Sequence, residues 1–112
     1  MQTFCGAFPI LPGRTEAGRQ FAKAVMGPRR KEYEESLHRQ GVSRESWFLQ
    51  STPLGDLMIV YFEAADLAKA LEAVGKSKDP FGVWFREQVK SVTGVDLAQP
   101  QEGPPPEEIV HV

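Results

Sequence analysis

Two apolar stretches separated by a short turn constrain the fold of this chain more than any other feature. They read ESWFLQST at residues 45–52 and LMIVYFE at residues 57–63, with PLGD between them. Both stretches are rich in β-branched and aromatic residues, and proline and glycine favour a tight reversal of the chain. The pattern predicts a β-hairpin with Pro53 and Gly55 in a type I turn that carries a glycine bulge.

The second stretch is apolar on both of its faces. Side chains alternate along a strand, which places Leu57, Ile59, Tyr61 and Glu63 on one face and Met58, Val60 and Phe62 on the other. Helices on one side of an antiparallel sheet cover only one face, and an exposed apolar face normally marks an interface or a ligand groove. We therefore expect a homodimer in which sheet faces sheet. A C-terminal tail lying over the open face is the alternative.

The loop length of the hairpin decides which residues of the first stretch share the open face. A three-residue loop pairs Thr52 with Asp56, whereas a two-residue loop slips the register and regroups the faces. We assume a three-residue loop, and we expect Phe4, Phe8 and Ile10 of the first strand to face the helices. The residues then predicted on the open face are Thr3, Cys5, Ala7, Trp47, Leu49, Leu57, Ile59, Tyr61 and Glu63.

Helix signals fill the regions around the hairpin. Thr15 is expected to cap a helix that reaches Gly27-Pro28, where the proline forces a kink or a fresh start, and charged residues then continue to Gly41. Asp66 and Gly75 bound the next helix, and a last one begins at Asp79-Pro80 and ends at Gly94. In this last helix DPFGVWFR presents either a ligand site or a core face. The helical spacing of Phe81, Trp84 and Phe85 favours the core face.

The two ends of the chain complete the predicted order. Residues 3–11 read as a first strand, and residues 98–108, rich in proline and glutamate, read as an extended connection to a short last strand, IVHV. A chain of 112 residues is expected to form a single domain. The order β-α-β-β-α-α-β predicts an α+β fold, a ferredoxin-like antiparallel sheet with its helices on one face.

Composition restricts the partners. Thirteen basic residues against fifteen acidic ones leave a net charge of −2, which does not suit nucleic-acid binding. The single cysteine, Cys5, forbids an internal disulfide and fits a reducing cytoplasm. The apolar start of the chain is interrupted by Pro9 and Pro12 and lacks a basic leader, so neither a signal peptide nor a membrane span is expected.

The LPGR junction between strand and helix and the stretch VYFEAADLAKAL resemble the dimeric α/β-barrel superfamily, and LPGRTEA, RRKEYE, TPLGD and DPFGVWFR resemble one of its uncharacterised families. That superfamily includes antibiotic-biosynthesis-type monooxygenases and an uncharacterised family of small bacterial proteins, and the resemblance covers residues 3 to about 97. It implies that two sheets pair into a barrel with a cavity between them. Some relatives degrade haem through a histidine on the helix after the hairpin, but residues 66–94 contain no histidine, which argues against haem unless His38 or His111 substitutes.

Within such a cavity Glu63 is the candidate acid-base residue, because apolar surroundings raise the pKa of a carboxyl. The alternative is a solvated strand end. Tyr61 and Trp47 could orient an aromatic ligand or serve only as interface packing. Cys5 fits a small buried hydrophobe better than a nucleophile, since no histidine accompanies it. His111 could reach the cavity from the last strand or lie on a frayed terminus, and His38 is expected in solvent or beside the terminal carbonyls of its helix.

Thr3, Cys5, Leu49, Ile59 and His111 complete the candidate ligand-binding set with Trp47 and Tyr61. The two histidines lack metal-ligand spacing, and no phosphate loop or dinucleotide motif occurs, so we predict no metal and no cofactor. The resulting hypothesis is a dimeric barrel that binds a small apolar or aromatic molecule. One alternative is a cofactor-free monooxygenase or isomerase that uses Glu63 and Tyr61, and the other is a purely structural or regulatory dimer.

Overall fold

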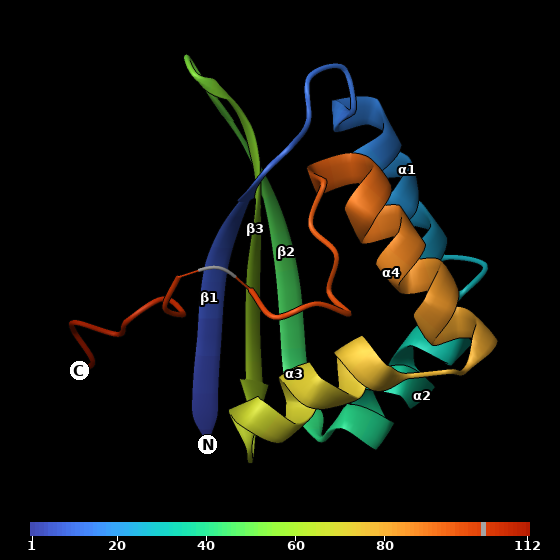
Figure 1. Ribbon diagram of the computed structural model, residues 1–112, viewed down its shortest axis with the longest axis vertical. Coiled ribbons are helices and arrows are strands. Elements are labelled where there is room, and N and C mark those ends of the chain that lie inside the picture. The colour runs from blue at the N-terminus through green and yellow to red at the C-terminus, as the bar shows by residue number, and fades with distance from the viewer. Residues whose placement is uncertain (102) are drawn as a thin grey trace.

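The described residues fold into a three-stranded sheet with four helices on one side (Figure 1). A computed structural model describes residues 1–101 and 103–112. The α+β class predicted from the sequence is confirmed, and the helices lie together beside the strands. In chain order the elements are β1 (Gln2–Pro9), α1 (Thr15–Met26), α2 (Arg30–Gln40), β2 (Val42–Thr52), β3 (Gly55–Ala64), α3 (Leu67–Lys76) and α4 (Pro80–Thr93).

The sheet has the order β1-β3-β2, and the central strand β3 is antiparallel to both neighbours. β1 and β2 are therefore parallel to each other, with β3 inserted between them. The predicted strand at residues 109–112 is wrong for the structure as described, because this segment is extended, unpaired and exposed. Four residues beyond a proline-rich connection would gain few ladder hydrogen bonds for the entropy lost on ordering them.

The hairpin forms, but its loop holds two residues rather than three. Thr52 pairs with Gly55, so Trp47 lies opposite Val60 and Phe48 opposite Ile59. The Thr52 hydroxyl donates to the Gly55 carbonyl at 2.6 Å and accepts from the Leu54 backbone N–H at 3.2 Å, which closes the turn. Gly55 has φ 129°, a value that a residue without a Cβ adopts readily. The assumed register was off by one residue, and this reverses the faces of β2.

Helix boundaries follow most of the glycine and proline signals, but Gly75 does not end α3, which continues to Lys76 and has its C-cap at Ser77. The break at Gly27-Pro28 is a fresh start, since α1 and α2 are separate helices. Gly41 and Gly94 adopt the left-handed conformation at the ends of α2 and α4, and the Asp66 carboxylate accepts from the Lys69 N–H at the start of α3. The predicted Thr15 cap is wrong. Thr15 is already helical, and its hydroxyl donates to Asp56 Oδ2 at 2.6 Å, which ties α1 to the hairpin.

The core lies between the sheet and the helices. Phe4, Phe8 and Ile10 of the β1 region face this side as predicted, in alternation with exposed Thr3, Cys5 and Ala7. The stripe in DPFGVWFR is core packing rather than a ligand site, because Phe81 is 2% exposed and Phe85 packs edge-on against Phe21 at 5.2 Å. One aromatic cluster therefore joins α1, α2, α4 and β2, and its members are Phe21, Tyr33, Trp47, Phe81, Trp84 and Phe85.

Within residues 1–101 and 103–112, none of the helices has the length and apolar character that crossing a bilayer would require.

Candidate functional site

The sheet face turned away from the helices carries the residues singled out from the β3 sequence. We call this surface the open face. Antiparallel pairing aligns its side chains in rows across the three strands. From one end to the other the rows are Thr3-Glu63-Arg44, Cys5-Tyr61-Ser46, Ala7-Ile59-Phe48 and Pro9-Leu57-Gln50. The first two rows are mostly polar and the last two mostly apolar, so the open face is divided along its length.

The polar half is organised around the Tyr61 hydroxyl. This group donates to Glu63 Oε2 at 2.5 Å, a short contact between side chains two residues apart on the same strand. The carboxylate of Glu63 raises the pKa of Tyr61, because the hydrogen bond favours the neutral phenol, while Thr3 and the positive charge of Arg44 act in the opposite direction. Glu63 is held further by its backbone, whose carbonyl accepts from the Ser43 hydroxyl at 3.3 Å. The arrangement places a phenol and a carboxyl in hydrogen-bond contact at the surface of the sheet.

The apolar half lies next to this hydrogen-bonded pair. Phe48 projects from β2 with 58% of its surface exposed, opposite Ile59 in the central strand. Leu57 and Ile59 are only partly buried, and Ala7 is exposed. An apolar ring beside two aliphatic side chains can pack against a flat apolar body. Within the chain as described, the exposure of these residues shows that no segment covers them.

Trp47 and Leu49 do not belong to this surface. They point toward the helices, and Trp47 contacts Phe21, Tyr33 and Phe85 with ring centroids 5.0, 5.9 and 5.8 Å away. The predicted orientation of both residues on the open face is therefore wrong, and the one-residue error in loop length is the cause. Phe48 stands opposite Ile59 and Ser46 opposite Tyr61, in the places assumed for Leu49 and Trp47. A two-residue loop applied to the sequence would have identified both.

The remaining candidates are scattered. Cys5 lies on the open face and is exposed, in the row of Tyr61. His111 lies on the exposed C-terminal segment, where its Nδ1 is 3.0 Å from Glu108 Oε1. His38 stands on the outer side of α2, in a shallow hollow with Glu34, Glu35 and Arg39. The structure thus brings Thr3, Cys5, Ile59, Tyr61 and Glu63 together and leaves both histidines elsewhere.

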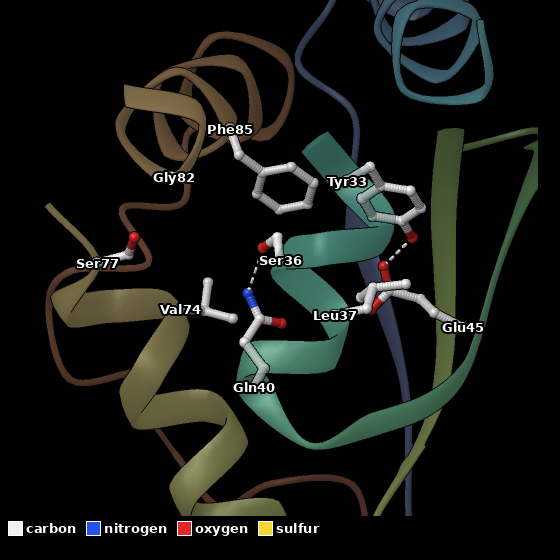
Figure 2. A pocket seen from close by; sticks show the side chains of 9 residues that line it. All are labelled: Tyr33, Ser36, Leu37, Gln40, Glu45, Val74, Ser77, Gly82 and Phe85. Carbon is white, nitrogen blue, oxygen red and sulfur yellow. Dashed lines mark hydrogen bonds between the residues drawn. The ribbon is translucent and has the colours of Figure 1, made fainter. Parts of the chain in front are cut away.

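A second polar site lies inside the helix layer, between β2, α2, α3 and α4 (Figure 2). It is a cavity of about 30 Å³, and because one water needs roughly 10–15 Å³, it has room for about two waters and none for an organic substrate. We call it the inner pocket. Its lining consists of Tyr33, Ser36, Leu37, Gln40, Glu45, Val74, Ser77, Gly82 and Phe85.

Glu45 is the ionisable residue of the inner pocket that sequence reasoning missed. Its Oε2 accepts hydrogen bonds from the Tyr33 hydroxyl and, at 3.1 Å, from Trp47 Nε1. Burial raises the pKa of this carboxyl, and the two hydrogen bonds only partly oppose the effect. Period-two alternation from Trp47 places Glu45 on the same face. The correct hairpin register would therefore have indicated a carboxyl turned into the core.

Metal ligands do not gather in the part of the chain that the structure describes, where no three His, Cys, Asp or Glu side chains converge. Comparison with curated proteins finds no match. The model of a family of unknown function, DUF6176, matches residues 1–98 and so takes in every helix and strand, the open face and the inner pocket. The chain therefore belongs to the DUF6176 family.

Proposed function

We propose that two copies of this protein pair through their open faces and enclose a site for a small apolar or aromatic molecule. The observation that carries the proposal is the division of one uncovered sheet face into a polar half around Tyr61 and Glu63 and an apolar half around Phe48 and Ile59. Ligand sites in proteins combine a mostly apolar wall with a few polar groups that set orientation. The open face supplies both parts.

Pairing with a second copy follows from the exposed apolar side chains. Exposure of Phe48, Leu57 and Ile59 to water is unfavourable, and covering them with another apolar surface lowers the free energy. A two-fold dimer uses the same patch on both copies, so one such face suffices. The split arrangement, with β3 between two parallel strands, is also that of ferredoxin-like domains, and it supports a dimeric α/β barrel as the assembled form.

Catalysis is the second candidate function, and the Tyr61–Glu63 hydrogen bond favours it. In the dimer both groups would lie in a space from which water is partly excluded. A carboxylate in hydrogen-bond reach of a phenol can accept a proton and pass it on, which fits a cofactor-free isomerase or monooxygenase acting on a cyclic or aromatic substrate. A dimer that binds nothing is the third reading, and the ligand experiment below separates it from the other two.

Sedimentation tests the dimer. Wild-type protein is expected to shift from monomer to dimer over a micromolar concentration range, and Phe48→Glu is expected to remain monomeric because the charge would be buried at the interface. Met26→Glu is the matched control, since Met26 is 57% exposed on α1, away from the open face. A wild-type monomer at all concentrations contradicts the proposal. Equal association of both variants contradicts it as well.

Cys5 offers an independent readout because it is the only cysteine and lies on the open face. Its rate of alkylation by a maleimide should fall as wild-type protein is concentrated and stay constant for Phe48→Glu. Ligand binding is then tested by thermal shift against aromatic acids, phenols and neutral aromatics, with Glu63→Gln as the comparison. A shift that depends on Glu63 supports the binding site, and a dimer unaffected by the whole panel leaves the purely structural dimer.

A further inference from the structure

The arginines of this chain have partners within the fold, with one exception. Six of the seven donate to a hydrogen-bond acceptor or form an ion pair, and these are Arg14, Arg19, Arg29, Arg30, Arg39 and Arg86. Arg44, on β2, forms no ion pair and no side-chain hydrogen bond within residues 1–101 and 103–112. Its guanidinium therefore keeps all of its donors free.

Arg44 also stands where the fold leaves the sheet uncovered. It is exposed at the polar end of the open face, in the row of Thr3 and Glu63, and it is the only basic residue in the four rows of that face. The pKa of Tyr61 is raised first by the hydrogen bond to Glu63, and the positive charge of Arg44 opposes this rise. The guanidinium thus lies close enough to affect the Tyr61–Glu63 pair.

Glu63 does not neutralise this cation. Side chains opposite each other in a row are near enough to interact, yet Arg44 and Glu63 form no ion pair. The carboxylate is turned along β3 instead, where its Oε2 accepts from the Tyr61 hydroxyl at 2.5 Å. An exposed pair of this kind would contribute little in any case. Arg44 is therefore available to an anion from outside the chain.

Covering the open face gives that anion a role. A positive charge taken out of water without a counter-ion is costly, so the dimer is favoured when an anion accompanies Arg44. Phe48 lies four positions further along β2 on the same face, about 13 Å away between Cα atoms at roughly 3.3 Å per residue. The long side chain of Arg44 can cover part of this distance. A ring and a carboxylate joined by a short chain would span the rest.

We propose that Arg44 is the carboxylate-binding residue of the open face, and that the enclosed ligand is an aryl-substituted carboxylic acid with its ring against Phe48 and Ile59. The planar guanidinium fork matches a carboxylate with two parallel hydrogen bonds, which gives orientation as well as affinity. This inference rests on the proposed function, to which it adds the charge of the ligand and the residue that recognises it.

Pairs of compounds with one shape and different charge test the inference. Phenylacetate and phenylpropionate are compared with phenylacetamide and phenylpropionamide by calorimetric titration of wild-type protein at dimer-forming concentration. Each acid is expected to bind about tenfold more tightly than its amide, because a hydrogen bond to a charged group is the stronger kind. Added salt should reduce this preference and leave amide binding unchanged.

Variants assign the preference to one residue. Arg44→Gln should weaken binding of the acids to the level of the amides without changing the amides. Arg30→Gln is the matched control, since Arg30 lies on α2, on the helix side of the sheet (Figure 1), and should keep the preference. Glu63→Gln should increase the preference, because it removes the one carboxylate in the row of Arg44.

The outcomes separate this inference from the proposed function. Equal binding of acid and amide by wild-type protein overturns the inference and leaves the ligand site standing, whereas binding of no compound overturns both. An acid preference that persists in Arg44→Gln overturns the inference as well. The comparison of acid with amide and its salt dependence need only wild-type protein, so they decide even where Arg44→Gln does not dimerise.

Discussion

At the scale of single residues, the open face shows how a strand places two polar groups in contact. Tyr61 and Glu63 are two positions apart on β3, so their side chains emerge on the same face and meet directly. Their relation depends only on the period of the strand and could be predicted from the sequence. Glu45 differs, because whether it faces solvent or core depends on how β2 pairs with β3.

The Tyr61–Glu63 contact predicts a titration that a single variant can move. Glu63 holds the pKa of Tyr61 above its ordinary value of 10.0, since the carboxylate accepts a hydrogen bond from the neutral phenol. Glu63→Gln is expected to bring that pKa down, because the largest cause of the shift is removed. Tyrosinate absorbance measured against pH in a Tyr33→Phe background isolates the Tyr61 signal. An unchanged titration would show that the two side chains do not interact in solution.

At the scale of elements, the register of the hairpin determines which β2 side chains lie on the open face. Its two-residue loop turns Trp47 and Leu49 into the core and Phe48 onto the open face. The helix ends were easier to predict, because Gly41 and Gly94 are local signals that act through their own backbone conformation. Strand pairing is a contact between distant positions, and one residue of slip exchanges the faces.

Neighbouring residues on β2 test this register. Trp47→Ala is expected to lower the free energy of unfolding by about 3 kcal/mol, because it empties a ring-sized space in the aromatic cluster. Phe48→Ala should cost about 0.5 kcal/mol or less when measured on dilute monomer, since Phe48 is 58% exposed there. Chemical denaturation of both variants gives the comparison. A larger loss for Phe48 than for Trp47 would favour the three-residue loop.

At the scale of the whole molecule, three strands and four helices form one layer of each kind, and the proline-rich tail contributes little. Ile109 and Val110 are 83% and 75% exposed, and the family model ends at residue 98. β1 therefore keeps one free edge within the described chain. The fourth strand was predicted from local β propensity alone, and four residues form too few contacts to pair stably with an edge strand.

Removal of residues 99–112 should leave the domain folded. The free energy of unfolding is expected to change by about 0.5 kcal/mol or less, because the exposed tail buries little apolar surface. Thermal and urea unfolding of the truncated and full chains test this. A loss of several kcal/mol would mean that the tail packs on the domain after all.

The sequence alone determined the elements of this protein. Alternation, capping residues and glycine stops act over a few positions, so the hairpin, the four helical segments, the core stripe of α4 and the shared face of Tyr61 and Glu63 could all be predicted. Only the tertiary structure decided the pairing of β2 with β3, which moved Trp47 into the core and brought Glu45 beside Tyr33. The physical reason is the sequence separation of the contacting residues. Strand register and side-chain burial depend on many contacts between distant segments, and a pattern within a few positions does not specify them.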